Sequence, residues 1–435
     1  MSFKNILPLN IAKNFSWLAL GEGTGMFLFY VTNIYIARVL DIEMFGNISF
    51  AFAMLPLLML FTDMGLSLYG IREVAKGPDS FLNISKMILP LRLTLSVIVF
   101  ILSSLLVLLF SQDLNISIIL ITAFLYVIPY SISLDWAFKG SEKMKYSALW
   151  LFLQNFIFLI LVILFIKSTE QATSIPLLRL IGIFVASIVL IRIGFKSWHI
   201  NLNFKINYWK DLLKSSSAFM ASVLGGAIFL NLDSILLGIM DSSHAIGIYS
   251  AAFRIFNIFF GIIFAFVLAH APEFSRLKNK AVILYTDSFS KRVHLITFFP
   301  TLFLLIFSDE IISTLYGVAY QEASLVLKML GVALFFQYLS NIYLTPLLFS
   351  GKERSYLISI YTAVIINAFI NSLLIPILSF KGAAIAAIFG NGILYLSGLI
   401  IFSIAFSLKR RAFLNEIFRT LILISTIGVI YLSIK

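Results

Sequence analysis

The chain has 435 residues, of which 60% are hydrophobic and only 12% are charged. That composition excludes an ordinary soluble globular protein, in which about a quarter of the residues are charged. The net charge of +12 would suggest a nucleic-acid partner in a soluble chain, but the positions of the basic residues explain it without nucleic acid. Because there is no cysteine, disulfides, thiolate catalysis and cysteine-ligated metals are also excluded.

Apolar runs of about twenty residues, each long enough to cross a bilayer as a helix, follow one another along the chain. They predict an all-α polytopic membrane protein with twelve core spans. A thirteenth run, 418–434, is shorter and either crosses the membrane or lies in its interface. The twelve spans are 16–39, 45–69, 88–110, 115–138, 146–166, 175–195, 215–240, 247–270, 293–313, 326–349, 356–378 and 382–407.

The loops between these runs alternate in charge. With the N-terminus placed inside, 23 Lys and Arg residues fall on the cytoplasmic side, five on the outer side and four within spans. Cytoplasmic loops of membrane proteins carry this excess of basic residues, so the N-terminus is predicted to be cytoplasmic. The outer loops, such as 41–44 and 111–114, are too short to hold a folded domain.

The spans divide into two halves. We expect a six-helix bundle over 1–195, a cytoplasmic interfacial linker over 196–214, a second six-helix bundle over 215–409, and a basic tail with a possible extra helix over 410–435. A weak repeat supports the division, because Gly46, Ser49 and Ala51 recur with the same spacing 201 residues later as Gly247, Ser250 and Ala252. Two halves with an even number of spans predict pseudo-two-fold symmetry about an axis along the membrane normal.

Ionisable residues inside spans are costly and are therefore the candidates for function. A rise of about 1.5 Å per residue places Glu22, Asp63 and Arg92 at similar depth near the cytoplasmic side, where they could form one cluster. Asp233 and Arg254 lie at matching depth on neighbouring antiparallel spans and can face one another. Arg179 lies nearer the end of its span.

Two interpretations of these charges are open. In one, they are structural ion pairs that allow helices to pack. In the other, Arg92, Arg179 and Arg254 bind an anionic group of the substrate, since a guanidinium can hold two oxygens at once. Glu22, Asp63 and Asp233 would then carry a coupling proton or another ion.

The sequence contains no catalytic constellation, and we expect neither an enzyme nor a cofactor. The four histidines are dispersed without metal-ligand spacing, and there is no P-loop. The glycines of the run GEGTG, residues 21–25, lie inside a span and predict close helix packing rather than a nucleotide loop.

Three stretches resemble a known family, the polysaccharide biosynthesis exporters of the Wzx (RfbX-like) type. They are ARVLDIEMFGNISFAFAMLPLLMLFTDMGLSLYGIREVAK at 37–76, DWAFKGSEKMKY at 135–146 and NLDSILLGIMDSSHAIGIYSAAFRI at 231–255. The resemblance implies two six-helix bundles around a central cationic cavity. It also implies a bacterial inner-membrane flippase that moves undecaprenyl-diphosphate-linked oligosaccharide, such as an O-antigen repeat unit, to the outer leaflet, with a polysaccharide polymerase and a chain-length regulator as possible partners.

Two rival functions are weighed against this expectation. Another exporter of the same superfamily, for multidrug or teichoic-acid cargo, would share the fold. A membrane polymerase or ligase would belong to another class, but such proteins tend to carry a large outer loop, and the outer loops here are short.

The charge count makes a direct prediction about topology. The N-terminus and the loops at 70–87, 139–145, 196–214, 271–292 and 350–355 are expected to be cytoplasmic. Single cysteines introduced into this cysteine-free chain near Lys143 or Lys205 will therefore resist an impermeant thiol reagent in intact cells. Labelling at either position would contradict this topology.

Overall fold

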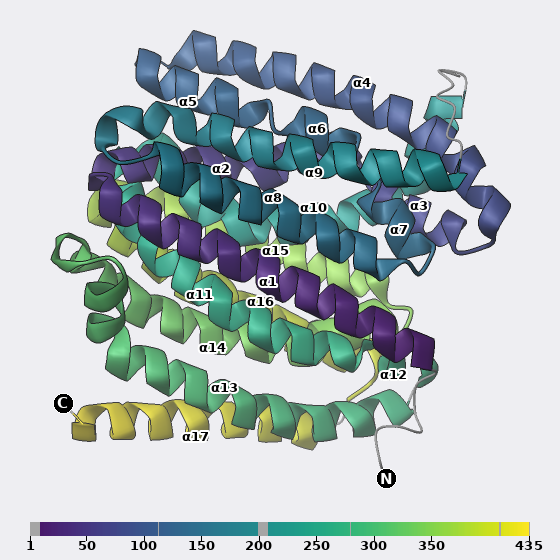
Figure 1. The fold of residues 1–435 in the computed structure, drawn as a ribbon. Coiled ribbons are helices and arrows are strands. Elements are labelled where there is room, and N and C mark those ends of the chain that lie inside the picture. The colour runs from purple at the N-terminus through teal and green to yellow at the C-terminus, as the bar shows by residue number, and fades with distance from the viewer. Residues whose placement is uncertain (1–8, 112, 199–207, 279, 409, 435) are drawn as a thin grey trace. The chain divides into compact units, whose positions relative to one another are not determined.

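The computed structural model describes residues 9–111, 113–198, 208–278, 280–408 and 410–434, and every regular element in these ranges is a helix (Figure 1). Twelve segments are long and apolar enough to cross a membrane. The chain is therefore a multi-pass membrane protein, as its composition predicted. Residues 199–207 of the predicted linker lie outside the described ranges.

The predicted spans agree with these helices. Eleven of them coincide with candidate membrane segments, and the twelfth candidate is Arg410–Ser433, so the C-terminal run forms one long helix. The first predicted span corresponds to α1 (Leu9–Val39), which is a continuous helix of 31 residues but is not among the twelve.

Contacts divide the chain into two compact units, 1–227 and 228–435, with the division inside helix α10. In the first unit α1 lies along α8, and α8 lies along α9. The elements of this unit are α1 (Leu9–Val39), α2 (Ile42–Asp63), α3 (Leu66–Val74), α4 (Pro78–Phe110), α5 (Leu114–Phe124), α6 (Val127–Ser131), α7 (Asp135–Gly140), α8 (Met144–Phe165), η2 (Thr169–Ser174), α9 (Ile175–Trp198) and the first part of α10 (Trp209–Met240).

One span of this unit is not a single helix. The predicted span 115–138 is divided into α5, α6 and α7, with Pro129 inside α6. Proline has no N–H to donate and interrupts the helical hydrogen-bond ladder, which leaves carbonyl groups free. In a membrane these carbonyls need partners from the protein itself.

The second unit is built around α14, most of whose length is buried and which contacts α11, α13 and α16. Helix α17 lies at the side of this unit, along α13 (Figure 1). The elements are the rest of α10, α11 (Ser243–Ala269), α12 (Ala271–Arg276), α13 (Lys280–Leu315), η4 (Val318–Tyr320), α14 (Glu322–Phe349), α15 (Glu353–Leu378), α16 (Phe380–Ala405) and α17 (Arg410–Ile434).

The weak repeat marks buried positions in both units. Ser49 and Ala51 are buried near the start of α2, and Ser250 and Ala252 are buried near the start of α11. Each set follows a short connection, and Asp41 caps α2 by accepting a hydrogen bond from the Met44 N–H at 2.7 Å. Small residues here allow neighbouring helices to approach closely.

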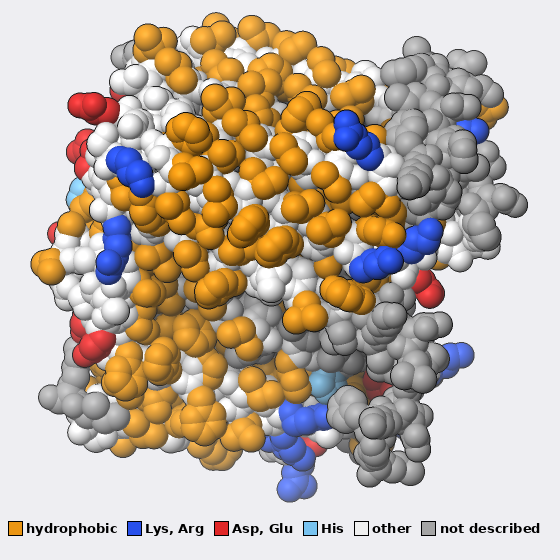
Figure 2. All heavy atoms as spheres, viewed as in Figure 1, with side chains coloured by type: hydrophobic (Ala, Val, Ile, Leu, Met, Phe, Trp, Pro, Cys, Tyr) orange, Lys and Arg blue, Asp and Glu red, His pale blue; other side chains and the backbone are white. Residues whose placement is uncertain are grey.

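Large apolar side chains are exposed along many helices, which is the reverse of a soluble protein. Phe110, Ile377 and Leu432 are each more than 70% exposed. Figure 2 shows hydrophobic side chains covering most of the visible face, with charged side chains mainly toward its edges. An apolar surface of this kind is suited to a lipid environment.

The contact between α1 and α8 depends on glycine. A Cβ atom at Gly21 would lie 2.4 Å from the Ala148 Cα, and one at Gly25 would lie 3.2 Å from the Leu151 carbonyl oxygen, whereas a Cβ at Gly23 would meet nothing within 4 Å. Close packing is therefore confirmed for the first and last glycines of the GEGTG run and not for the middle one.

The two positions give a matched pair of variants. Gly21→Ala is expected to force α1 from α8 and to destabilise the protein by about 1–3 kcal/mol, the usual cost of overpacking. Gly23→Ala is expected to be neutral or slightly stabilising, because alanine favours the helix. Melting temperatures of the purified variants in detergent will measure this difference. Equal melting temperatures would contradict the α1–α8 packing.

Candidate functional site

Two of the three charges predicted to meet in the first unit do form a pair. The Arg92 Nε lies 3.2 Å from the Asp63 Oδ1, and the Arg92 side chain is only 1% exposed. Asp63 also accepts hydrogen bonds from the backbone N–H and the hydroxyl of Ser67. The carboxylate is thus held at the junction of α2 and α3, and the depth argument placed this pair correctly.

Arg92 also serves the broken span. Its guanidinium donates to the carbonyl oxygens of Ser133 and Tyr130, each at 3.4 Å, and lies over the Tyr130 ring at 5.0 Å. These carbonyls belong to the interrupted segment around α6 and α7. Arg92 therefore has a structural role, because it donates hydrogen bonds to backbone carbonyls at the end of α6 and just after it.

Glu22 does not join this pair. Within the described part of the chain its electrostatic partners are Lys139 and Asp135, on α7. Those two residues form their own ion pair, with 2.9 Å between the Lys139 Nζ and the Asp135 Oδ2. The expected cluster of three is thus two separate groups, because α1 packs beside α8 and has few contacts with α2.

Arg179 is surrounded by aromatic rings. Its Cζ lies 4.2 Å from the centroid of Phe52, 4.8 Å from that of Phe29 and 5.2 Å from that of Tyr126. The Tyr126 hydroxyl donates to Gln154 and also interacts with the Arg179 guanidinium, whose Nη1 is buried without a hydrogen-bond partner among the described residues. No carboxylate pairs with this guanidinium in the ion pairs of those residues.

Aromatic faces attract a cation but do not accept its N–H groups in the way that oxygens do. The Arg179 site therefore keeps a positive charge and at least one donor group available to an oxygen-rich anion. Substrate binding by Arg92, Arg179 and Arg254 stays a prediction. Arg179 lies four residues into α9, near the end that the charge pattern places outside.

In the second unit, Asp233 has neutral partners. Its carboxylate accepts from the Tyr249 hydroxyl at 3.1 Å, from the Asn367 amide at 3.1 Å and from the Asn371 amide at 2.7 Å. The side chain is 6% exposed, and the Asn371 Oδ1 beside it has no partner among the described residues. No ion pair to Asp233 occurs in this part of the structure, so the expected pairing with Arg254 is not among its contacts.

Arg254 is buried on α11 and is 8% exposed. Tyr249, one of the donors to Asp233, precedes it by five residues on the same helix. Asp233 itself lies on α10, and the amides that hold its carboxylate come from α15. Sequence depth gave the level of Asp233 in the membrane and not its partners.

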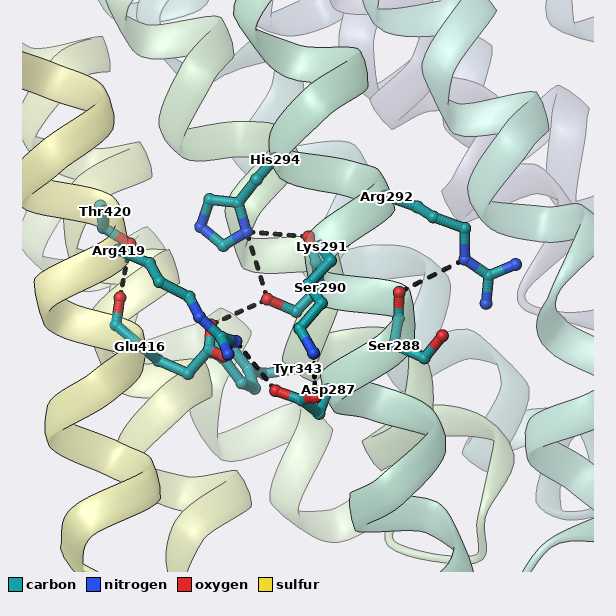
Figure 3. Close-up of polar contacts among 10 residues, drawn as sticks. All are labelled: Asp287, Ser288, Ser290, Lys291, Arg292, His294, Tyr343, Glu416, Arg419 and Thr420. Carbon is teal, nitrogen blue, oxygen red and sulfur yellow. Dashed lines mark hydrogen bonds and ion pairs between the residues drawn. The ribbon is translucent and has the colours of Figure 1, made fainter. Parts of the chain in front are cut away.

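The structure also shows a polar cluster that sequence reasoning missed. Glu416 and Arg419 of α17 meet Asp287 and Ser290 of α13 and Tyr343 of α14 (Figure 3). Glu416 is 7% exposed. The signal in the sequence is the pair of opposite charges three residues apart, Glu416 and Arg419, but the apolar run that predicts the last helix begins only at 418.

Comparison with known proteins shows the family. The family model described as polysaccharide biosynthesis protein matches residues 11–278, more than half of the chain, and the chain belongs to this family. It is 23% identical over 347 residues to a protein of Escherichia coli (strain K12) named "Putative O-antigen transporter", covering 78% of this chain and 83% of that protein. A protein of the same name from Shigella dysenteriae is 23% identical over 271 residues, covering 61% of this chain and 68% of the relative.

Solved structures show the same fold. The lipid II flippase MurJ in an inward closed conformation superposes with a TM-score of 0.73 at 15% identity, covering 96% of this chain and 92% of that one. An inward-facing multidrug resistance MATE family transporter also gives 0.73, at 12% identity, with 90% and 98% coverage. The predicted exporter fold is thereby confirmed.

Proposed function

We propose that this protein moves an undecaprenyl-diphosphate-linked oligosaccharide, an O-antigen or similar repeat unit, from the inner to the outer leaflet of the bacterial inner membrane. The transport proceeds by alternating access and is coupled to a proton or another ion. Membership of the polysaccharide biosynthesis family, the names of the two relatives and the fold shared with a lipid flippase support this proposal.

The observation that carries the proposal is the environment of Arg179. A guanidinium beside three rings, with a buried Nη1 that has no acceptor among the described residues, retains its charge for a ligand. A diphosphate is a fitting ligand, because its oxygens accept the paired N–H groups of arginine. Arg254 is the corresponding candidate of the second unit, and Arg92 contributes by holding α6 in place.

The physical task of the protein is to lower the cost of moving a hydrated, charged head group through hydrocarbon. An ionised group in a low-dielectric medium loses many kcal/mol of hydration unless it is paired. Fixed guanidinium groups replace part of that hydration, while the lipid tail of the substrate remains in the bilayer. The protein itself forms no covalent bond with the substrate.

Asp233 is the candidate for ion coupling. Its carboxylate is buried among neutral donors and so lacks a cationic partner in the contacts described above. A buried carboxylate of this kind gains stability by binding a proton or a small cation. The free Asn371 Oδ1 supplies a second oxygen at the same place. Glu22 and Asp63 are the other two predicted coupling residues, and each has a basic neighbour, Lys139 and Arg92 respectively.

Variants of Arg179 and Arg92 distinguish a substrate-binding role from a structural one. Arg179→Met is expected to reduce export of the lipid-linked repeat unit at least about tenfold at normal protein level, because the charge is lost and the packing stem remains. Arg179→Lys will retain part of the activity, since charge survives without the bidentate fork. Arg92→Ala is the control. It will lower the amount of folded protein, because Asp63 is left as an unpaired buried charge, which destabilises the fold by about 3 kcal/mol. Full export by a well-expressed Arg179→Met variant would refute the binding role.

Asp233→Asn tests the coupling. The variant keeps a hydrogen-bond acceptor for Asn371 but cannot take up a proton or offer a negative charge to a cation. In proteoliposomes it is expected to insert normally, while its transport no longer responds to an imposed proton or sodium gradient. Asp309→Asn is the matched control, because Asp309 pairs with Lys328 away from these amides. An unchanged gradient response in Asp233→Asn would exclude this residue from coupling.

A further inference from the structure

The cluster between α13, α14 and α17 contains a buried carboxylate whose two oxygens are both engaged. The Glu416 Oε1 is paired with the Arg419 guanidinium, which also lies 2.8 Å from the Asp287 Oδ1. The Glu416 Oε2 accepts from the Ser290 hydroxyl at 2.8 Å and from the Tyr343 hydroxyl at 3.2 Å (Figure 3). Glu416 is therefore a negative charge fixed in position by three helices.

His294 extends this network by one further group. Its Nδ1 lies 2.8 Å from the Ser290 carbonyl oxygen and 3.2 Å from the Ser290 hydroxyl, which in turn donates to Glu416. A carbonyl oxygen only accepts, so Nδ1 carries the proton of the neutral imidazole and Nε2 is the acceptor. His294 is 6% exposed, and its Nε2 has no hydrogen-bond partner among the described residues.

The chemistry of this free nitrogen limits what it can bind. A metal ion would need several ligand atoms, and no group of three or more potential ligands occurs in the described residues. An anion would be repelled by Glu416. A proton needs only one lone pair and is stabilised by a nearby negative charge, and imidazole takes up a proton within the physiological range.

We propose that His294 and Glu416 form a proton-binding site at the contact of α13 with α17, separate from Asp233, and that the bound proton strengthens this contact. The proton enters at the His294 Nε2. The resulting imidazolium on α13 faces the Glu416 carboxylate on α17 through the single hydroxyl of Ser290. This inference does not depend on which substrate the protein carries.

The charges around the site determine the direction of the effect. Asp287, Lys291 and His294 come from α13, Tyr343 from α14, Tyr395 from α16, and Glu416 and Arg419 from α17. Lys291 pairs with Asp287, and Arg419 pairs with both Asp287 and Glu416, while the imidazole reaches the second Glu416 oxygen through the Ser290 hydroxyl. Arg292 points away and donates to the Ser288 carbonyl (Figure 3). The added positive charge therefore attracts α17 more than it repels it.

Helix α17 has few other attachments. Its contacts are mainly with α13, and beyond Thr420 only Ile427 is buried among its described side chains. Between helices in lipid there is no hydrophobic driving force, so polar contacts contribute much of the association. Together with the 2.8 Å hydrogen bond between the Tyr395 and Thr420 hydroxyls, this cluster therefore contributes to how firmly α17 is held.

Occupancy of the site can be observed directly by nuclear magnetic resonance of the imidazole nitrogens in the full chain. The protein has four histidines, and the His294→Gln variant identifies the resonance of His294. We expect an Nδ1–H tautomer at about pH 8 and a second proton on Nε2 as the pH falls toward about 5. In Glu416→Gln the doubly protonated form will be lost or will need more acid. An imidazole that stays neutral over this range, or one that titrates identically in Glu416→Gln, would overturn the site.

The effect on α17 is measured with spin labels on exposed positions of the two helices, at Phe303→Cys on α13 and Val429→Cys on α17. Lowering the pH over the same range is expected to reduce the population with long inter-label distances at least about twofold. The change should vanish in His294→Gln and persist in the control His270→Gln, whose imidazole bonds to Phe266 instead. The same pH response in His294→Gln would show that the proton acts elsewhere.

Discussion

A charge or a backbone carbonyl inside hydrocarbon must find its partner within the protein, and most polar features of this fold follow from that constraint. The broken span of α5, α6 and α7 is the plainest case. The span is broken between α6 and α7, and the buried Arg92 of α4 donates to the carbonyls of Tyr130 and Ser133 at that break. Asp63 then balances the charge that was brought in. The carbonyls thus receive a donor from Arg92, and the charge of Arg92 receives a carboxylate from Asp63.

Function is suggested by the buried polar residues that lack a full set of partners. Among the described residues, Arg179 has mainly aromatic faces around it, Asp233 has amides and a hydroxyl in place of a cation, and the His294 Nε2 has no hydrogen-bond partner. Arg92, by contrast, has a carboxylate and two backbone carbonyls as partners. A transported anion would bind at Arg179, a coupling ion at Asp233 and a proton at the His294 Nε2.

Much of the fold could be predicted from the sequence, because run length and hydropathy determine which segments can cross a bilayer. Depth along the helix also predicted the Asp63–Arg92 pair. Depth does not give rotation about the helix axis or the identity of neighbours. Glu22 is therefore influenced by the charges of Lys139 and Asp135 rather than joining Asp63, and Asp233 is held by Asn367 and Asn371, more than 130 residues away. Glu416 was missed because it precedes the apolar run that was used to define the last helix.

The central claim is that this chain carries a lipid-linked oligosaccharide across the membrane. The most direct test is the leaflet distribution of the lipid-linked repeat unit in a deletion strain, measured by its accessibility to an impermeant reagent in intact cells. The account predicts accumulation on the inner leaflet and recovery of outer-leaflet material when the native chain, but not Arg179→Met, is restored. An unchanged distribution in the deletion strain would contradict it.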